Sequence, residues 1–391
     1  MKLLIRNAKV ITPYEILDNK NVIVKDGKIA EITSDELSPD GFLEVIDAKS
    51  NYLSPGFIDI HNHGNSGYDF MDADFEAFDE ISKFHLKNGV TSYLLTTITS
   101  KHQDLIDALN AGSEYIESNM RYSNMVGIYL EGPYFSKEKK GAQPERYLKN
   151  PTIEEIDDFI KASRNHLTVV SIAPEMGNSL NSIRYLKEKG IKVAMGHTNS
   201  TYDIAKKAID SGASIATHLY NGMRSFSHRE PGIIGASLTD ERVRCEIIAD
   251  MIHIHKAAIK LAIDIKGYDS IVLISDAMMA AGKSDGEYTL GGQDVTVKEG
   301  KAMLKDGTIA GSTLTLDKAV YNLVNHLGIK LNDAVRMATL SSAKAIGIDD
   351  KKGSIEIGKD ADMIIFDDKL NILNTIVNGE VCYYKDIQLD I

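Results

Sequence analysis

Two histidines one residue apart, His61 and His63, directly follow an apolar run and have side chains well suited to bind a metal. The run, residues 56–60, is short and apolar, as in a buried β-strand. Residues two apart in an extended strand point to the same side, so both imidazoles would face one point. Imidazole nitrogen binds zinc, iron, copper and nickel. The pair therefore indicates half of a metal site, unless it is a solvated strand end with two unrelated histidines.

Four more residues able to bind a metal or move a proton follow other apolar runs: Glu131, His197, His218 and Asp276. Any one of them could be solvated, or could bond a loop amide, with no part in chemistry. Six such residues at strand ends are better explained by one shared site. Imidazoles and a carboxylate can hold one or two divalent ions, such as zinc, iron or manganese, and leave a position open for water.

The chemistry expected of this set is hydrolysis. A bound divalent ion lowers the pKa of its water towards neutrality and polarises the carbonyl group under attack. Asp276 would take the proton from the water and later deliver it to the leaving nitrogen, acting first as general base and then as general acid. The residue types therefore predict cleavage of an amide or a related bond.

The elements that must position these residues are strands that alternate with amphipathic helices. Apolar residues recur at helical spacing in residues 74–88, 153–163, 179–190 and 201–211. The apolar runs predict eight strands, ending near Ile60, Thr96, Glu131, Ala173, Gly196, His218, Asp250 and Asp276. This alternation predicts an α/β protein with a (β/α)8 TIM-like barrel, whose catalytic groups stand at the carboxyl ends of the strands.

The two ends of the chain have a different pattern. Alternating or continuous apolar residues predict strands at 3–11 and 21–32, and further strands at 363–366, 372–377 and 381–384. We expect residues 1–54 and 352–391 to form a small β-sandwich domain, with residues 55–351 inserted between its halves as the barrel domain. Late in the barrel segment, we expect an inserted hairpin at 287–305 and helices at 313–327 and 331–347.

Composition narrows the class of protein. The formal net charge is −12, which argues against nucleic acid or an anionic membrane as the main partner. No apolar stretch approaches the length of a membrane span, and residues 1–7 predict a strand rather than a signal peptide. Only two cysteines are present, Cys245 and Cys382, so a disulfide framework is excluded and a cytoplasmic location is expected.

Longer motifs surround the six residues and carry a family resemblance. They lie at residues 55–64, 130–134, 196–198, 217–221, 229–232, 248–250, 275–277, 310–315 and 358–362. Over nearly its whole length the chain resembles the amidohydrolase superfamily, and within it the N-acetylglucosamine-6-phosphate deacetylases. The motifs at 130–134 and 217–221 are the most specific to the deacetylases.

The resemblance implies that Glu131, His197 and His218 hold the principal metal. It implies that His61 and His63 supply a second site, with Glu131 bridging the two. Other amidohydrolases bridge their metals with a carboxylated lysine at strand four. Residues 171–175 contain no lysine, which counts against a hydantoinase-like, dihydroorotase-like or urease-like enzyme.

The resemblance also implies a set of substrate contacts: Gln143, Ala142, Asn221, Gly222, Arg229 and His253. Arg229 would bind the phosphate across the interface of a homodimer, because a guanidinium can bind phosphate bidentately. The alternative for Arg229 is a surface cation paired with Glu230. His253 would orient the sugar or the acetyl carbonyl, whereas His228 and His255 are more simply explained as solvated loop residues.

The expected activity is hydrolysis of N-acetylglucosamine 6-phosphate to glucosamine 6-phosphate and acetate. The alternatives are deacetylation of N-acetylgalactosamine 6-phosphate or another N-acyl amino-sugar phosphate, and a non-catalytic amidohydrolase-like scaffold. The chain departs from the family pattern at Tyr129, Gly222 and the loop Met278-Met279. Each departure is expected to touch the wall of the pocket.

Overall fold

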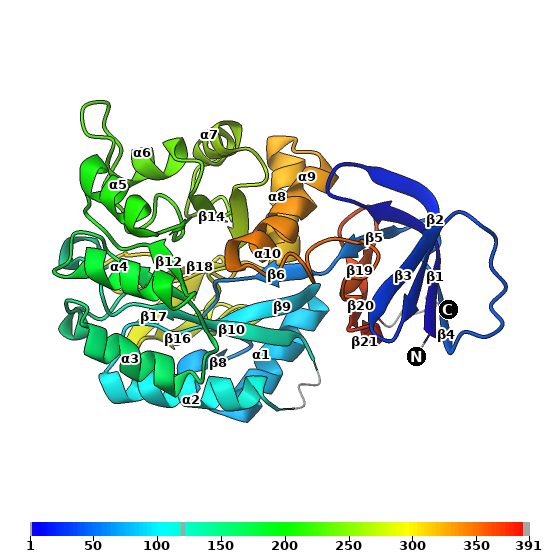
Figure 1. The fold of residues 1–391 in the computed structure, drawn as a ribbon, viewed down its shortest axis with the longest axis horizontal. Coiled ribbons are helices and arrows are strands. Elements are labelled where there is room, and N and C mark those ends of the chain that lie inside the picture. The colour runs from blue at the N-terminus through cyan, green and yellow to red at the C-terminus, as the bar shows by residue number, and fades with distance from the viewer. Residues whose placement is uncertain (1, 119–121, 386–391) are drawn as a thin grey trace.

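The computed structural model describes residues 2–118 and 122–385, and its larger part is a barrel of eight parallel strands (Figure 1). In sheet order they are β6 (Phe57–Asp59), β9 (Val90–Thr96), β10 (Asn124–Glu131), β11 (Leu167–Ile172), β12 (Lys192–Met195), β13 (Ile215–Ala216), β14 (Arg244–Ile248) and β15 (Ile271–Ile274). The first and last strands meet where the Asp276 N–H donates to the His61 carbonyl oxygen at 2.9 Å. Ser275 Oγ donates to Asp59 Oδ2 at 2.6 Å in the same place. The predicted barrel is therefore confirmed.

A helix follows each barrel strand and covers the outside of the sheet (Figure 1). These helices are α1 (Phe75–Lys87), α2 (His102–Ile116), α3 (Ile153–Ala162), α4 (Ser179–Glu188), α5 (Tyr202–Ser211), α6 (Gly232–Thr239), α7 (Lys256–Lys266) and α8 (Leu316–Leu327). Helix α3 shows why they form where they do. Thr152 caps it by accepting the Glu155 N–H at 3.2 Å, and its apolar stripe, Ile156 and Phe159, is buried against the barrel.

Two segments differ from the pattern-based prediction. The insertion after β15 is a three-stranded antiparallel sheet, not a hairpin, and consists of β16 (Gly286–Leu290), β17 (Gln293–Lys298) and β18 (Lys301–Met303). The helix expected at 331–347 is split into α9 (Leu331–Met337) and α10 (Leu340–Ile346). The split has a tertiary cause, because the Ala338 carbonyl accepts the N–H of Ile58 on β6 at 2.8 Å.

The two ends of the chain form a second sheet, at the right of Figure 1. Its order is β21 (Glu380–Tyr384), β20 (Ile372–Val377), β19 (Met363–Phe366), β5 (Tyr52–Pro55), β1 (Lys2–Ile11), β2 (Ile16–Lys25) and β3 (Lys28–Thr33), with β4 (Glu44–Asp47) also paired to β1. The pairing of β19 with β5 joins the two ends, so the expected small β domain is present. The domain boundaries, after residue 54 and before residue 352, stay a prediction.

The β domain packs against the barrel end opposite to the carboxyl ends of the strands. Thr375 Oγ1 of β20 donates to the Leu86 carbonyl at 2.7 Å, and Ile364 and Ile372 share an apolar cluster with Phe57. The carboxyl ends are therefore left for loops, which include β7 (Gly64–Asn65), β8 (Tyr68–Asp69) and three short 3-10 turns at Phe70–Asp72, Lys137–Lys139 and Glu145–Tyr147.

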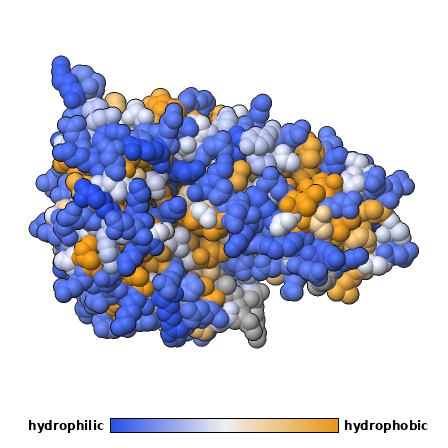
Figure 2. All heavy atoms as spheres, viewed as in Figure 1, coloured by the Kyte–Doolittle hydropathy of each residue, from blue (hydrophilic) through white to orange (hydrophobic). Residues whose placement is uncertain are grey.

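On the face drawn in Figure 2, hydrophilic residues predominate and apolar ones are scattered among them. Among the residues that the structure describes, none of the helices combines the length and the apolar character needed to cross a membrane.

Candidate active site

The six residues singled out at the predicted strand ends converge at the carboxyl end of the barrel. They form two groups of three, in each of which one ligand atom per residue lies within 4.8 Å of the others. The first group is His61, His63 and Asp276, and the second is Glu131, His197 and His218. All six are buried, with exposed fractions of 8% or less.

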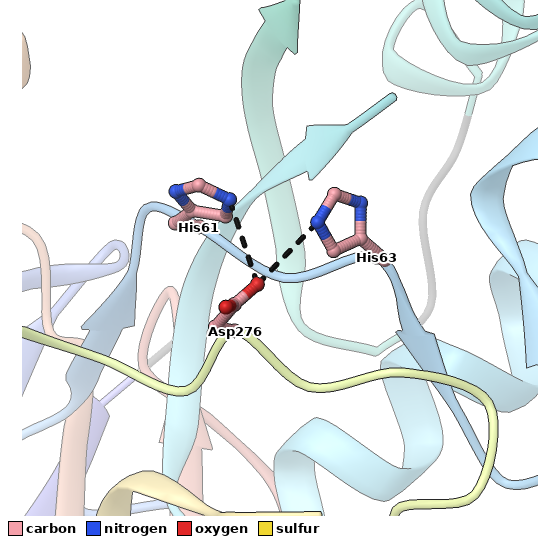
Figure 3. A group of neighbouring side chains, drawn as sticks. All are labelled: His61, His63 and Asp276. Atoms are coloured by element: carbon pink, nitrogen blue, oxygen red, sulfur yellow. Dashed lines mark ion pairs between the residues drawn. The ribbon is translucent and has the colours of Figure 1, made fainter. Parts of the chain in front are cut away.

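In the first group, two imidazoles from the loop after β6 face the carboxylate that follows β15 (Figure 3). Asp276 Oδ1 lies 3.7 Å from His61 Nε2 and 3.4 Å from His63 Nε2. The side-chain convergence predicted from the two-residue spacing is therefore present.

In the second group, Glu131 Oε1 lies 3.3 Å from His197 Nε2 and 3.2 Å from His218 Nε2. The same carboxylate also faces the first group, with 3.5 Å from Oε1 to His61 Nε2 and 3.5 Å from Oε2 to His63 Nε2. Glu131 thus lies between the two groups, where a bridging ligand would have to be.

The donor set fits a divalent metal. His197 Nε2 and His218 Nε2 face each other at 3.2 Å, close to Glu131 Oε1. His61 Nε2 is buried and has no hydrogen-bond partner among the described residues, although two carboxylates are near it. Imidazole nitrogens and carboxylate oxygens that converge in this way are the ligands that divalent metals such as zinc bind.

Opposite charges dominate the ionisation of the site. Burial disfavours the charged form of His61, but Glu246, Glu131 and Asp276 outweigh it and raise the pKa of the ring to about 9. At His63, Asp276 and Glu131 likewise overcome the effect of burial and raise the pKa to about 9. Burial opposes ionisation of Asp276, yet the nearby imidazoles lower its pKa to about 2. The carboxylates therefore create a negative potential that favours a bound cation.

Three of the six residues occupy an unusual backbone conformation. His197, His218 and Asp276 have φ angles of 44°, 29° and 49°, in the left-handed region. Such a conformation costs about 1–3 kcal/mol for a residue other than glycine, and persists only where surrounding structure enforces it.

A cavity of about 250 Å³ opens above the ligand atoms. Of the predicted site residues, it is lined by His63, Glu131, Ala142, Gln143, His197, His218, Asn221, Gly222, His253 and Asp276. Its wall also contains residues that were not among the predicted site residues: Ile98, Gly141, Leu290, Thr308, Ile309 and Gly311. His61 lies beneath the cavity and does not line it.

Three predicted contact residues have geometries that limit what they can do. Gln143 Nε2 donates to Glu131 Oε2 at 2.5 Å and its Oε1 accepts the Thr99 N–H at 2.9 Å, so its amide is already bonded. His253 Nδ1 donates to Asp250 Oδ2 at 2.6 Å, which leaves Nε2 free to face the cavity. Gly222 has φ 59°, and an added Cβ would lie 2.8 Å from His197 Nδ1.

Arg229 is the predicted site residue that the structure does not bring into this cavity. It is exposed, and it is absent from the cavity wall of the single chain. The alternative pairing with Glu230 is also not seen among the described residues. Glu230 Oε1 instead accepts the backbone N–H groups of Tyr202 at 2.8 Å and Gly232 at 3.0 Å.

Two of the three departures from the family pattern do not line the cavity themselves. Tyr129 is fully buried inside the barrel, where its ring packs 4.7 Å from that of His61 and its hydroxyl bonds Thr217 Oγ1 at 2.9 Å. Met278 packs into the apolar cluster under the β16–β18 sheet. Only Gly222 lines the cavity.

Sequence reasoning missed Glu246, a residue of β14 that directly contacts the site. Glu246 Oε2 lies 3.0 Å from His61 Nδ1 and accepts the His218 backbone N–H at 3.1 Å. Its carboxyl group stands inside the apolar run 245–249, and an acidic residue in such a run is a signal that could have revealed it.

A barrel with a buried histidine and carboxylate centre at its carboxyl end is the architecture of a metal-dependent hydrolase. Residues 52–382 match the amidohydrolase family, and the chain belongs to this family.

Individual relatives define a narrower class of protein than the family does. The chain is 37% identical over 384 residues to the N-acetylglucosamine-6-phosphate deacetylase of Bacillus subtilis (strain 168), with 97% of each chain covered. It is 36% identical over 380 residues to the N-acetylgalactosamine-6-phosphate deacetylase of Escherichia coli O157:H7, covering 97% of this chain and 99% of that one. The crystal structure of N-acetylglucosamine-6-phosphate deacetylase from Pasteurella multocida matches with a TM-score of 0.93 and 36% identity, covering 98% and 100% of the two chains. The resemblance to these deacetylases is therefore confirmed.

Proposed function

We propose that this protein is a metal-dependent deacetylase that hydrolyses N-acetylglucosamine 6-phosphate to glucosamine 6-phosphate and acetate. The observation that carries the proposal is the pair of three-residue ligand groups beneath the cavity. The similarity to curated deacetylases over nearly the whole chain supports the substrate class.

Glu131, His197 and His218 would hold one divalent ion, and His61 and His63 would hold a second, with Glu131 shared between them. When bound, such an ion lowers the pKa of a coordinated water and polarises a carbonyl oxygen. Zinc, iron and manganese all suit nitrogen–oxygen ligands, and we propose zinc as the first ion to test.

Asp276 would act as the proton carrier. Its carboxylate lies at the cavity wall and has a lowered pKa of about 2, so it is ionised at neutral pH and can accept a proton from the attacking water. The water oxygen bonds the acetyl carbonyl carbon. The proton then passes from Asp276 to the amide nitrogen as the carbon–nitrogen bond breaks, which releases acetate and the free amine.

The other residues of the cavity would position the substrate. The Nε2 atom of His253 can accept a hydrogen bond from a sugar hydroxyl, because Nδ1 carries the proton that is donated to Asp250. Ile98, Leu290 and Ile309 give the wall an apolar portion. Both polar atoms of the Gln143 amide are already bonded, to Glu131 and Thr99. We therefore propose that Gln143 contacts the substrate only through the edge of its amide group.

The phosphate would be bound by Asn221, the Gly222 N–H and Arg229. The exposed position of Arg229, outside the cavity of its own chain, supports its delivery by the second subunit of a homodimer. A guanidinium can bind two phosphate oxygens in parallel.

The galactosamine epimer is the second candidate substrate. The similarity to the Escherichia coli N-acetylgalactosamine-6-phosphate deacetylase, at 36% identity, is the reason to test this epimer as a substrate. The two sugars differ in the orientation of one hydroxyl group.

A panel of acetate-release measurements tests the proposal. The purified protein, supplied with zinc, would be assayed with N-acetylglucosamine 6-phosphate, its galactosamine epimer, and N-acetylglucosamine without phosphate. We expect the first to be hydrolysed with the highest kcat/KM, and the unphosphorylated sugar to react far more slowly. Absence of acetate from both phosphorylated sugars would refute the function, and preference for the epimer would reassign the substrate.

We also propose a cytoplasmic location. Cys245 is buried, and neither Cys245 nor Cys382 forms a disulfide, as expected of a protein in a reducing compartment. Localisation of a tagged chain by cell fractionation would test this.

A further inference from the structure

Glu246 is a buried carboxylate that belongs to neither ligand group and does not line the cavity. Its side chain is completely inaccessible to solvent. Its Oε2 atom accepts from His61 Nδ1 at 3.0 Å and from the backbone N–H of His218 at 3.1 Å. One oxygen atom therefore connects a histidine of the first ligand group with a histidine of the second.

Packing alone does not explain a charged group at this position. Burying a carboxylate costs several kcal/mol unless a cation and hydrogen bonds compensate for lost water. Within residues 2–118 and 122–385, His61 is the only ion-pair partner of Glu246, and Oε1 of Glu246 has no hydrogen-bond partner. No lysine or arginine of these residues pairs with it.

The contact with Glu246 also decides which nitrogen of His61 carries the proton. An ionised carboxylate can only accept a hydrogen bond, so Nδ1 of His61 must be the protonated nitrogen. In the neutral ring that would bind a metal, the lone pair is therefore on Nε2, and this atom lies 3.5 Å from Glu131 Oε1 and 3.7 Å from Asp276 Oδ1. The ring of Tyr129, 4.7 Å away, packs against the imidazole and further limits its rotation.

We propose that Glu246 is a positioning residue of the metal site. It would hold the His61 ring in one orientation and one tautomer, with Nε2 directed to the metal. It would also fix the backbone of His218 by accepting the hydrogen bond from its N–H group. Metal-binding histidines commonly donate their second N–H to a carboxylate, and loss of that carboxylate weakens metal binding about 10- to 100-fold.

Zinc affinity measures this role directly. Wild-type protein, Glu246→Gln and Glu246→Leu would be stripped of metal and titrated with zinc against a chromophoric chelator. We expect affinity to fall about 100-fold in Glu246→Leu, and about 10-fold in Glu246→Gln, whose amide oxygen can still accept from Nδ1. Asp333→Asn is a matched control, because Asp333 is a buried carboxylate paired with Arg336 at 2.7 Å and belongs to neither ligand group.

A role in folding alone would give a different result. It would lower the melting temperature of the metal-free variants but leave their zinc affinity unchanged. An affinity within threefold of wild type in Glu246→Leu would overturn the proposal, and Glu246→Gln decides the matter if the leucine variant does not fold. The inference rests on the metal site of the proposed function but not on its substrate. Acetate release by the wild type in the same preparation therefore tests the function separately.

Discussion

The protein contains two clusters of buried or partly buried charged groups, and they are built in opposite ways. One lies near the β domain, where Lys352 Nζ is 3.0 Å from Asp360 Oδ2 and also contacts Asp362. Asp362 Oδ1 further accepts the N–H of Asn378 at 2.7 Å. In this cluster, which we call the lysine cluster, each carboxylate is matched by a cation or an N–H donor.

The ligand groups at the barrel mouth, which we call the unmatched cluster, contain no lysine or arginine. Imidazole nitrogens and carboxylate oxygens face one another, and His61 Nε2 has no hydrogen-bond partner within the described part of the chain. The comparison shows two uses of buried charge. Carboxylates paired with a lysine stabilise the fold, whereas carboxylates and imidazoles without a lysine or arginine favour binding of a cation from solution.

Glu131→Gln should break the unmatched cluster most completely. Glu131 is the carboxylate that faces all four imidazoles, at 3.2–3.5 Å. We expect zinc binding to be lost and kcat to fall about 10⁴-fold or more, because both ion chemistry and proton transfer depend on the bound metal. Zinc titration and acetate release would be measured together, and a variant that keeps a tenth of the wild-type kcat would contradict a bridging role.

Asp276→Asn should separate proton transfer from metal binding. The substitution removes the proposed general base but leaves Glu131, His197 and His218 in place. We expect kcat to fall about 10³-fold, within the range of general acid–base catalysis, while the protein still binds zinc at the second group. Unchanged turnover would exclude Asp276 as the proton carrier.

Arg229→Ala should weaken substrate binding more than catalysis. A hydrogen bond to a charged group contributes about 1.5–3 kcal/mol, so we expect KM for the phosphorylated sugar to rise about 10- to 100-fold with little change in kcat. Arg242→Ala is the control, because Arg242 is an exposed arginine paired with Asp240 and Asp210. Equal KM values for the two variants would leave Arg229 as a surface cation.

Lys352→Met should lower the stability of the fold and leave activity unchanged, whereas the active-site substitutions should lower activity. It removes the cation that Asp360 and Asp362 share, and Asp360 keeps its second partner, Lys28. Breaking a buried pair costs about 3–5 kcal/mol, so we expect a loss of stability below that range for this partly buried cluster. Urea unfolding should show this loss, with kcat unchanged. Lys305→Met is the control: its pair with Asp294 is exposed, so its removal should have almost no effect. Similar unfolding midpoints for the two variants would show that the lysine cluster is not stabilising.

The pH dependence of stability gives the smallest expected effect. Burial opposes the charge on Lys352, but Asp362 and Asp360 outweigh it and raise its pKa above the ordinary 10.5. Its stabilising contribution is therefore complete below pH 10.5 and is lost as the pH rises through the raised pKa. The stability difference between wild type and Lys352→Met should shrink above pH 10.5. A stability difference that stays constant above pH 10.5 would contradict the assignment of this stabilisation to the charged form of Lys352.

The strand ends could be predicted from the sequence because a barrel strand is a short apolar run and its end is marked by the first polar residue. His197, His218 and Asp276 each follow such a run, and this placed all three at one end of the barrel. The four helices expected at 74–88, 153–163, 179–190 and 201–211 were predicted to within two residues for the same kind of reason, since an amphipathic stripe is a local pattern.

Features that depend on tertiary contacts could not be predicted in this way. Glu246 lies inside a strand that is buried on both faces. Polar and apolar side chains do not alternate in such a strand, so the sequence does not indicate to which face the side chain of Glu246 points. The break between α9 and α10 depends on the contact of Ala338 with Ile58, from a distant part of the chain. The cavity wall formed by Ile98, Leu290 and Ile309 likewise comes from two loops and the end of β16, whose meeting no local pattern determines.

The central claim is that an externally supplied cation at the barrel mouth makes this protein a deacetylase. Acetate release from N-acetylglucosamine 6-phosphate would be measured before chelation, after chelation verified by elemental analysis, and after zinc, manganese or iron is restored. We predict that activity disappears with the metal and returns when at least one of these ions is added. Full turnover by protein shown to contain no metal would contradict the account.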